Sequence, residues 1–238
     1  MINNKTSAAF VLGLLLGISV ITASWLLAGS ALEIKEYERT VSVKGLSERE
    51  VAADTAIWPI RFSAAGNSAS DLYALMENQA ETVSAFLIAA GFSEEEISTN
   101  APRVTDRYAE RWGEQNANLR YTAEQTLTVY SQQIDLVRDT QQTTAELGKQ
   151  GIVIGGDDYN LRTVYTFNGL NDIKPAMVEE ATRNARAVAE QFAEDSNSKI
   201  GKMKRANQGQ FSIQDRDNNT PYLKRVRVVS TIEYYLDD

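Results

Sequence analysis

The sequence predicts an α+β protein, with an N-terminal transmembrane helix followed by a domain of largely antiparallel sheets that carry helices on one face. Residues 8–32 contain no charged side chain, and they are numerous enough for a helix to cross a hydrocarbon core of about 30 Å. Most later segments alternate apolar and polar residues with a period of two, which is typical of antiparallel strands with one solvated face. Three other segments place apolar residues at helical spacing. The expected element order after the membrane helix is β-β-α-β-β-α-β-α-β-β.

The apolar stretch at residues 8–32 predicts a signal anchor that remains in the inner membrane as a single-pass helix. Lys5 is the only lysine or arginine before it, so the positive-inside rule keeps residues 1–7 in the cytoplasm as an N-terminal tail. The C-terminal domain then lies in the periplasm. Trp25, near the outer end of the stretch, suits the membrane interface.

Two further features of this stretch leave alternatives open. Ala28-Gly29-Ser30 resembles the small-residue site of a cleaved signal peptide, and cleavage there would release the protein into the periplasm. Gly13 and Gly17 form a GxxxG pattern, which can bring two spanning helices together. Glycine is also frequent in spanning helices in general, and this is the simpler explanation of the pattern.

The composition excludes several classes of function. The chain has a net charge of −8, and the exported part lacks Lys5 and is more acidic still. This is the wrong sign for binding nucleic acid or anionic lipid headgroups. Cysteine and histidine are absent, which removes thiol nucleophiles, thiolate and histidine metal sites, and Ser-His-Asp chemistry. We therefore expect a protein that is not an enzyme and has no catalytic residue, cofactor or metal ligand.

The exported domain is predicted to span residues 40–238, after a charged linker at residues 33–39. Residues 40–45 and 51–65 alternate as strands. The charged residues 46–49 between them predict a turn, so we expect the domain to open with a hairpin.

The second strand of this hairpin is expected to bury one face. That face carries Ala56, Trp58, Ile60, Phe62 and Ala64. Pro59 has no backbone donor, so the strand should lie at an edge or pair on one side only at that point. Residues 92–100 are expected to lead into a third strand that ends near Tyr108. Further strand segments are predicted at 120–130, 152–154 and 159–167, from Lys199 onward, and at 224–236.

Three helices are expected to pack on the sheets. The first begins with Ser68 as its cap and ends at Gly91, and the second covers residues 134–147. The third is predicted to be capped by Asn171 or Asp172. Its core-facing side is expected to carry Met177, Ala181, Ala185, Val188 and Phe192.

A few polar or aromatic segments resemble parts of known sites. Glu94–Glu96 could contact a cation, but a solvated turn explains three adjacent acids better. Residues 215–219 resemble the start of a calcium loop, but the loop lacks the central glycine and has Val226 where a bidentate Glu would sit. A hairpin turn is the favoured interpretation. Gly155-Gly156 does not lead into a helix, which argues against a phosphate-binding loop, and Trp112 could contact a partner.

One class of enzyme, a carboxylate-based cell-wall hydrolase, stays open on this composition. Such enzymes hold two carboxyl groups roughly 5–9.5 Å apart. The candidate carboxylates are Glu110, Glu114, Asp157 and Asp158. All four fall in expected loops or turns, where acidic residues are common for reasons of solvation alone.

Three groups of residues follow one another along the chain: Val41–Gly45 then Asp54, Leu87–Gly91 then Ile97–Thr99, and Ala181-x-x-x-Ala185-Arg186-x-x-Ala189 then Lys199–Gly201. In this order and spacing they resemble the SIMPL-domain family of exported bacterial proteins, which includes periplasmic immunogenic and oxidative-stress-associated members. The resemblance covers roughly residues 38–236. This sequence departs from the usual glycine-rich opening by having Lys44 before Gly45. The resemblance implies an α+β fold outside the inner membrane and brings no catalytic residues.

The sequence thus leads to an expectation about function. We expect a membrane-tethered, non-enzymatic SIMPL-domain protein of the periplasm that acts by self-assembly into a homo-oligomer or by binding a protein partner, in envelope or oxidative stress protection. Exposed sheet edges would serve such assembly. The alternatives are a ligand-binding or transport-accessory domain and, less favoured, the carboxylate-based hydrolase.

Overall fold

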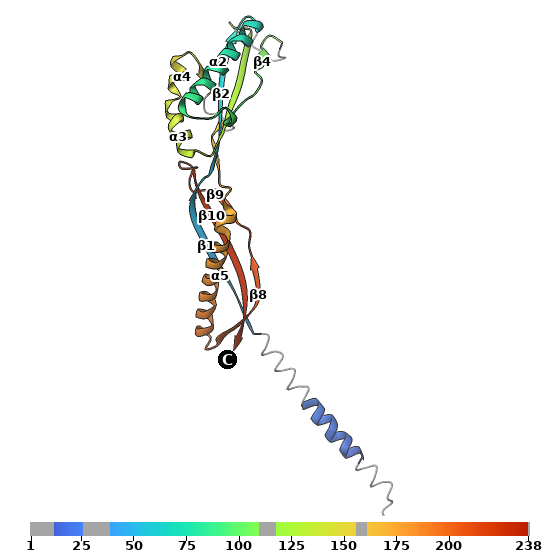
Figure 1. The fold of residues 1–238 in the computed structure, drawn as a ribbon. Helices are drawn as coiled ribbons and strands as arrows, with labels where there is room; N and C mark the ends of the chain where they lie inside the picture. The colour runs from blue at the N-terminus through green and yellow to red at the C-terminus, as the bar shows by residue number, and fades with distance from the viewer. Residues whose placement is uncertain (1–11, 26–38, 110–117, 156–160, 238) are drawn as a thin grey trace, which may run out of the picture. The chain divides into compact units, whose positions relative to one another are not determined.

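The computed structural model contains two compact units (Figure 1). The residues that it describes are 12–25, 39–109, 118–155 and 161–237. Unit 1 comprises residues 1–48, 175–211 and 227–238, and unit 2 comprises residues 49–174 and 212–226. The described strands pair antiparallel wherever a register is defined, and helices accompany them in both units, which confirms the expected mixed α+β class.

Residues 12–25 form a helix with exposed side chains. The rest of the expected anchor, residues 8–11 and 26–32, lies outside the described residues. In the described part of the chain, no helix is both long and apolar enough to cross a membrane. A Cβ added at Gly13 or Gly17 would have no neighbour within 4 Å, so the structure shows no contact for the GxxxG pattern.

Unit 2 is built on a six-stranded sheet. Its strands are β2 (Thr55–Gly66), β3 (Ile97–Thr99), β4 (Arg103–Asp106), β5 (Tyr121–Ser131), β6 (Val153–Ile154) and β7 (Val164–Thr166). The long strands β2 and β5 pair with each other at the centre. The short strands β3 and β4 pair with β5, and β6 and β7 pair with β2. The outer strands of this sheet are therefore all short.

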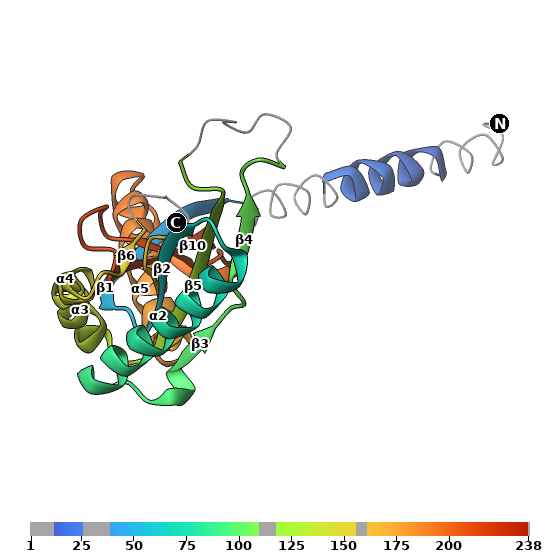
Figure 2. The ribbon, with the colours of Figure 1, turned by 90° about the horizontal axis from the view of Figure 1, so that it is seen from above.

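Helix α2 covers the central strands of unit 2. The helices of this unit are α2 (Ala69–Ala90), α3 (Ile134–Thr143) and α4 (Ala145–Lys149), with a 3-10 turn η1 at Glu94–Glu96. Figure 2 shows α2 lying along β2 and β5. Buried side chains of α2 (Leu72, Met76, Val83 and Leu87) share one apolar core with Trp58, Ile60 and Phe62 of β2. Each such side chain contributes about 1.5–3 kcal/mol through burial. The core face predicted for the strand at residues 51–65 is confirmed.

The ends of α2 also agree with the sequence. The Ser68 hydroxyl accepts a hydrogen bond from the Asp71 backbone N–H at 3.4 Å, which satisfies one of the free donors at the start of a helix. Gly91 ends the helix in the left-handed region with φ 114°, where a Cβ would be strained.

Unit 1 consists of one long helix on a sheet. The strands of this sheet follow the order β1-β10-β8. The elements are β1 (Thr40–Ala52), α5 (Leu170–Asp195), β8 (Lys199–Gln208) and β10 (Leu223–Asp237), of which β1, α5 and β10 also contribute residues to unit 2. The short strand β9 (Ser212–Asp215) pairs with β10 within unit 2.

The expected opening hairpin is wrong. Residues 46–49 continue the strand, and β1 pairs with β10 while β2 pairs with β5. Alternate residues of β1, from Val43 through Gly45 to Ser47, stay buried through the supposed turn. The charged residues of this segment suggested a turn, but Glu48 is an exposed residue of the strand, and the small residues Gly45 and Ser47 allow a helix to approach it.

Two boundaries and one buried face also differ from the sequence prediction. The segment that ends near Tyr108 forms two short strands, β3 and β4, instead of one. Helix α5 begins at Leu170, before the expected caps Asn171 and Asp172. Val188 and Phe192 are exposed, because the buried stripe of α5 repeats every four residues. It consists of Met177, Ala181, Ala185, Ala189 and Ala193.

Candidate functional site

Gly45 meets the alanines of α5 in unit 1. These residues belong to two of the three groups on which the resemblance to the SIMPL family rests. A Cβ at Gly45 would lie 1.8 Å from the backbone oxygen of Ala181 and 2.5 Å from the backbone nitrogen of Ala185. Such distances are far below any van der Waals contact, so β1 and α5 touch backbone to backbone at this point. Only glycine fits here. The alanine stripe of α5 permits this approach, and these residues form a structural contact.

The free edge of β1 is partly covered by the same helix. Asn184 Nδ2 donates to the backbone oxygen of Leu46 at 2.8 Å, and the Ser47 hydroxyl donates to Glu180 Oε2 at 2.9 Å. Glu180 and Asn184 lie one turn apart, on the side of α5 next to β1. The main-chain oxygen of Leu46 is therefore engaged by α5 and is not available to another strand.

Asp54 holds the start of α5. Its carboxylate accepts hydrogen bonds from the backbone N–H groups of Asn168 (2.6 Å) and Gly169 (2.9 Å), from Asn168 Nδ2 (2.9 Å) and from the Thr55 hydroxyl (3.0 Å). Burial by itself raises the pKa of Asp54, but the hydrogen bonds from Asn168, Thr55 and Gly169 outweigh it and hold the pKa below its ordinary value of 3.8. The role of this residue is therefore to cap the segment that leads into α5.

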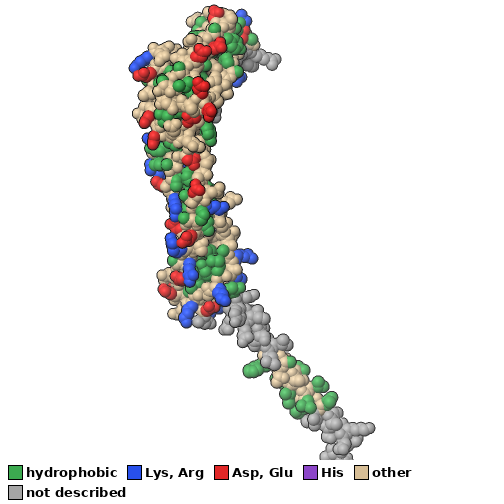
Figure 3. All heavy atoms as spheres, viewed as in Figure 1, with side chains coloured by type: hydrophobic (Ala, Val, Ile, Leu, Met, Phe, Trp, Pro, Cys, Tyr) green, Lys and Arg blue, Asp and Glu red, His purple; other side chains and the backbone are tan. Residues whose placement is uncertain are grey.

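Strand β8, like β1 at the other end of the sheet, is a long edge strand whose outer side pairs with no other described strand. It lies at the end of the strand order in unit 1, and eight of its ten residues are exposed. Its cations are Lys199, Lys202, Lys204 and Arg205. Figure 3 shows blue Lys and Arg side chains projecting on the side of this unit where β8 lies. The edge is thus both accessible and basic, on a chain whose net charge is −8.

One of the four cations is anchored. Lys204 Nζ lies 3.2 Å from Glu233 Oε1 on the neighbouring strand. The hydrogen bonds from the Thr40 hydroxyl and from Lys204 lower the pKa of Glu233. Neither Lys202 nor Arg205 has an ion pair within 4.0 Å among the described residues, so their charges are available to a partner.

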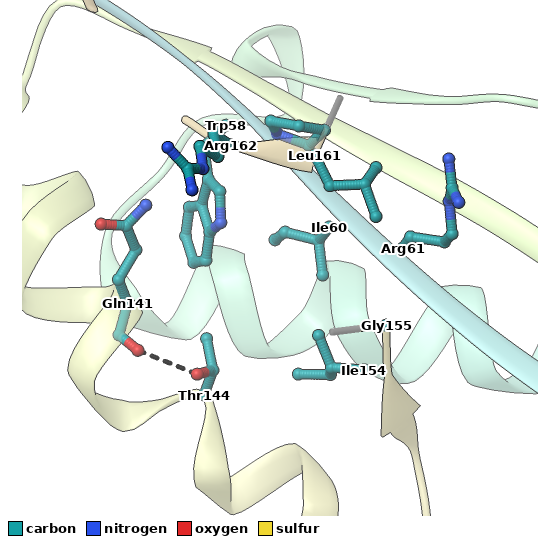
Figure 4. A pocket seen from close by; sticks show the side chains of 10 residues that line it. Trp58, Ile60, Arg61, Gln141, Thr144, Ile154, Gly155, Leu161 and Arg162 are labelled. Carbon is teal, nitrogen blue, oxygen red and sulfur yellow. Dashed lines mark hydrogen bonds between the residues drawn. The ribbon is translucent and has the colours of Figure 1, made fainter. Parts of the chain in front are cut away.

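A pocket of about 300 Å³ lies in unit 2 where the sheet is interrupted (Figure 4). Strand β7 pairs with β2 up to Ile57, and β6 pairs with it again at Phe62. Trp58–Ile60 pair with β5 on one side of β2 and with no described strand on the side of β6 and β7. This confirms the one-sided pairing expected at Pro59. Because Pro59 has no backbone N–H, the gap leaves one fewer main-chain donor unpaired and costs less free energy.

The pocket has a mixed lining. Its apolar walls come from Trp58, Ile60, Ile154 and Leu161, and its polar side chains include Gln141 and Thr144. Figure 4 shows the Thr144 hydroxyl bonded to the backbone oxygen of Gln141, at 2.8 Å. The volume is at the lower limit of the roughly 300–1,000 Å³ typical of ligand pockets, so the pocket gives modest support to the alternative of a ligand-binding domain.

The structure also places most of the polar segments that the sequence singled out. Glu96 Oε2 accepts a hydrogen bond from the Ser93 backbone N–H at 2.9 Å, in a capping box, so this acid belongs to a solvated turn. Asp215 pairs with Lys224 across the β9–β10 hairpin, and Asp217 Oδ1 accepts from the backbone N–H of Asn219 at 2.8 Å. The hairpin turn expected there is confirmed.

The candidate carboxylates of the hydrolase hypothesis, Glu110, Glu114, Asp157 and Asp158, lie outside the described residues, and so does Trp112. The accessible edge of β8 was not recognised in the sequence. A usable signal exists, because Lys199–Arg205 carries four cations in an otherwise acidic chain.

In a comparison with family models, residues 41–230 match SIMPL, described as a protein of unknown function (DUF541). The chain belongs to the SIMPL family. The match starts in β1 and ends in β10, so the SIMPL region includes both units and the contact of Gly45 with α5. A comparison with curated proteins gives no match.

Proposed function

We propose that this SIMPL protein is a membrane-tethered envelope protein that acts without catalysis by binding an extended segment of a partner protein at strand β8. The tether is the uncharged stretch at residues 8–32, with residues 1–7 in the cytoplasm and the domain at residues 40–238 in the periplasm. Residues 12–25 are helical and expose large apolar side chains, which is consistent with a lipid environment. The resemblance to stress-associated exported proteins suggests envelope or oxidative stress protection as the process.

The observation that carries the proposal is the uncovered edge of β8. An edge strand offers a row of unpaired N–H and C=O groups, and an extended peptide can add to it as a further strand. Main-chain hydrogen bonds then supply affinity, and side chains supply specificity. Because β8 carries four cations, the matching segment is an acidic one.

The same cations argue against pairing of β8 with the β8 of a second copy. In an antiparallel two-fold pair, Lys and Arg side chains would face one another, and like charges in opposite positions of two strands are destabilising. Lysines on an edge are a common means of preventing self-association. A different protein is therefore the better source of the strand.

A second candidate function, self-assembly into a homo-oligomer, has support of its own in α5. Val188 and Phe192 are 41% and 55% exposed, and they are one turn apart on one side of the helix. Two exposed apolar side chains at this spacing form a small stripe that a second copy could cover.

The experiment uses the full chain in a mild detergent. A labelled peptide of alternating Val and Glu is titrated with the protein, and binding is followed by fluorescence anisotropy at low and high salt. We expect saturable binding that weakens at least tenfold in Lys202→Glu/Arg205→Glu and that is reduced by salt. The matched control, Lys149→Glu/Lys174→Glu, makes the same change of charge in unit 2 and should bind like the wild type. Equal affinity of the two double variants would refute the role of β8.

The absolute mass from light scattering separates the two candidates. A defined oligomer that dissociates in Phe192→Ser supports self-assembly through α5. A monomer at all concentrations that still binds the acidic peptide supports partner binding at β8.

A further inference from the structure

The pocket at the interrupted edge of β2 contains an indole donor without a partner. Trp58 is only 6% exposed, and it is one of the residues that line the pocket. Its Nε1 donates no hydrogen bond to any residue that the structure describes. Buried polar groups nearly always have a partner, and a buried tryptophan usually places its N–H against an acceptor. The missing acceptor therefore calls for an explanation.

The indole nitrogen is in contact with the space of the pocket. Among the described residues, the side chains that carry a fully enclosed polar atom without a partner are Gln79, Gln125 and Ser230. Trp58 Nε1 is not one of these atoms, so protein atoms do not enclose it. Figure 4 shows the indole ring in the wall of the pocket, with its nitrogen on the side of Ile60. The donor is thus open to a ligand in the pocket.

The main chain beside Trp58 presents an acceptor to the same pocket. The backbone oxygen of Arg61 accepts from the backbone N–H of Gly155 at 2.6 Å, so the main-chain groups of Arg61 point toward β6. Alternate residues of an antiparallel strand direct their main-chain groups to the same side, and β2 pairs with β5 without a shift of register. Pro59 therefore directs its carbonyl into the gap between β6 and β7, where no described residue donates to it.

The remaining walls of the pocket suit a short branched alkyl group. Ile60, Ile154 and Leu161 line it with aliphatic side chains. Its volume of about 300 Å³ is at the lower limit for ligand pockets, so the ligand is small. A donor and an acceptor beside an aliphatic wall are complementary to one neutral amide with an alkyl substituent, because an amide carries both an acceptor oxygen and an N–H donor.

We propose that this pocket binds a neutral amide group that bears a short branched alkyl chain. The amide oxygen accepts a hydrogen bond from Trp58 Nε1, and the amide N–H donates to the backbone oxygen of Pro59. The alkyl chain packs against the aliphatic wall. This combination of groups occurs in a small free amide and in a leucine residue of a peptide.

A carboxylate of the same shape fits the pocket less well. It brings acceptors only, so it would face the Pro59 oxygen without a donor between them. Arg61 and Arg162 also line the pocket, but each already has an interaction of its own in the protein. Figure 4 shows Arg61 at the opposite end of the pocket from Trp58. We therefore expect the pocket to discriminate between an amide and a carboxylate that have the same alkyl chain.

The test uses the full chain in a mild detergent, with isotope-labelled indole rings that are followed by NMR. The chain has three tryptophans, and Trp58→Phe identifies the indole N–H signal that belongs to the pocket. The protein is titrated with isocaproamide, with isocaproate and with a capped alanine–leucine–alanine tripeptide. We expect isocaproamide to move the Trp58 signal downfield in a saturable manner and to leave the other two in place. Isocaproate should bind at least tenfold more weakly.

The tripeptide separates two sources of the same group. Tighter binding of isocaproamide indicates a small free amide as the natural ligand, and tighter binding of the tripeptide indicates a peptide segment. Either result supports the proposal, because both ligands present the amide and the branched chain.

Three variants locate the site, with affinities from isothermal titration calorimetry. Trp58→Phe removes the donor and should weaken the binding of isocaproamide at least tenfold, because the enclosed amide oxygen loses its partner. The matched control Trp25→Phe makes the same change in the helix at residues 12–25 and should leave binding unchanged. Leu161→Trp fills the pocket, keeps Trp58 in place and should abolish the movement of its signal. The melting temperature of each variant shows that unit 2 remains folded.

The proposal is wrong if the Trp58 signal responds to neither amide ligand, if isocaproate binds as tightly as isocaproamide, or if Trp58→Phe and Trp25→Phe lose affinity equally. The pocket lies in unit 2 and its ligand is uncharged, so this test is independent of the salt-dependent binding proposed for β8.

Discussion

Replacing Gly45 by alanine tests the contact between β1 and α5. The added Cβ would sit 1.8 Å from the backbone oxygen of Ala181, and ordinary contact begins near 3.4 Å, so the helix must move away by about 1.6 Å. The obstacle is backbone, which cannot adopt another rotamer. Overpacking of a core costs about 1–3 kcal/mol when side chains can adjust. We therefore expect Gly45→Ala to destabilise unit 1 by at least about 3 kcal/mol.

The assay is thermal and urea unfolding of the full chain, followed by far-UV circular dichroism. For a unit of this size, each kcal/mol corresponds to roughly 4–8 °C in Tm, so a loss of about 3 kcal/mol lowers the transition by more than about 12 °C. Gly148→Ala in α4 is the matched control. A Cβ there has no neighbour within 4 Å, and alanine favours a helix by up to about 1 kcal/mol.

A melting temperature of Gly45→Ala within about 2 °C of the wild type would refute this reasoning, since a displacement of that size cannot be free of cost. Ala181→Gly should not rescue the variant, because the clash involves the backbone oxygen of that residue and leaves its side chain uninvolved.

Three further predictions concern unit 2. Asp54→Ala should cost about 2–4 kcal/mol, because the N–H groups it binds lose a charged acceptor. The pKa of Asp54 is depressed in the folded protein, so its contribution is present above pH 3.8 and lost as the pH falls below that value. Urea titrations of wild type and Asp54→Asn should therefore converge in acid. Asp215→Ala leaves the buried Lys224 without its partner and should cost about 1–3 kcal/mol. Adding Lys224→Met should recover most of this loss, and calorimetry of the single and double variants checks both values. Gly91→Ala places a Cβ at φ 114° and should cost about 1–2 kcal/mol, measured as a shift of the urea midpoint at constant slope.

Local patterns in the sequence were sufficient for the elements that depend on their own residues. The stripe of α2, its cap Ser68 and its end at Gly91 follow from helical spacing and from the chemistry of helix ends. The buried face of β2 follows from alternation, and the missing donor of Pro59 accounts for its one-sided pairing. In each case the residues that carry the signal belong to the helix or strand itself or lie directly next to it in the sequence.

The errors involve partners that are distant in the sequence. Ser47 was predicted to lie in a turn, because its burial depends on α5, which lies more than 120 residues further on. The start of α5 was misplaced because the segment before it, Asn168 and Gly169, is held by Asp54, which lies 114 residues before Asn168 in the chain. Val188 and Phe192 looked like core residues, although the alanines beside them face the sheet.

The sequence by itself determined the α+β class, the α2 core and the uncharged stretch at residues 8–32, because composition and short-range periodicity carry these features. The order and spacing of three groups of residues along the chain indicated the SIMPL family. Only the tertiary structure decided which strands pair, that β8 remains an uncovered edge, and that Trp58, Pro59 and Leu161 line one pocket. The physical reason is that strand pairing and surface exposure depend on contacts between residues far apart in the chain, and no local pattern encodes which of the compatible partners is chosen.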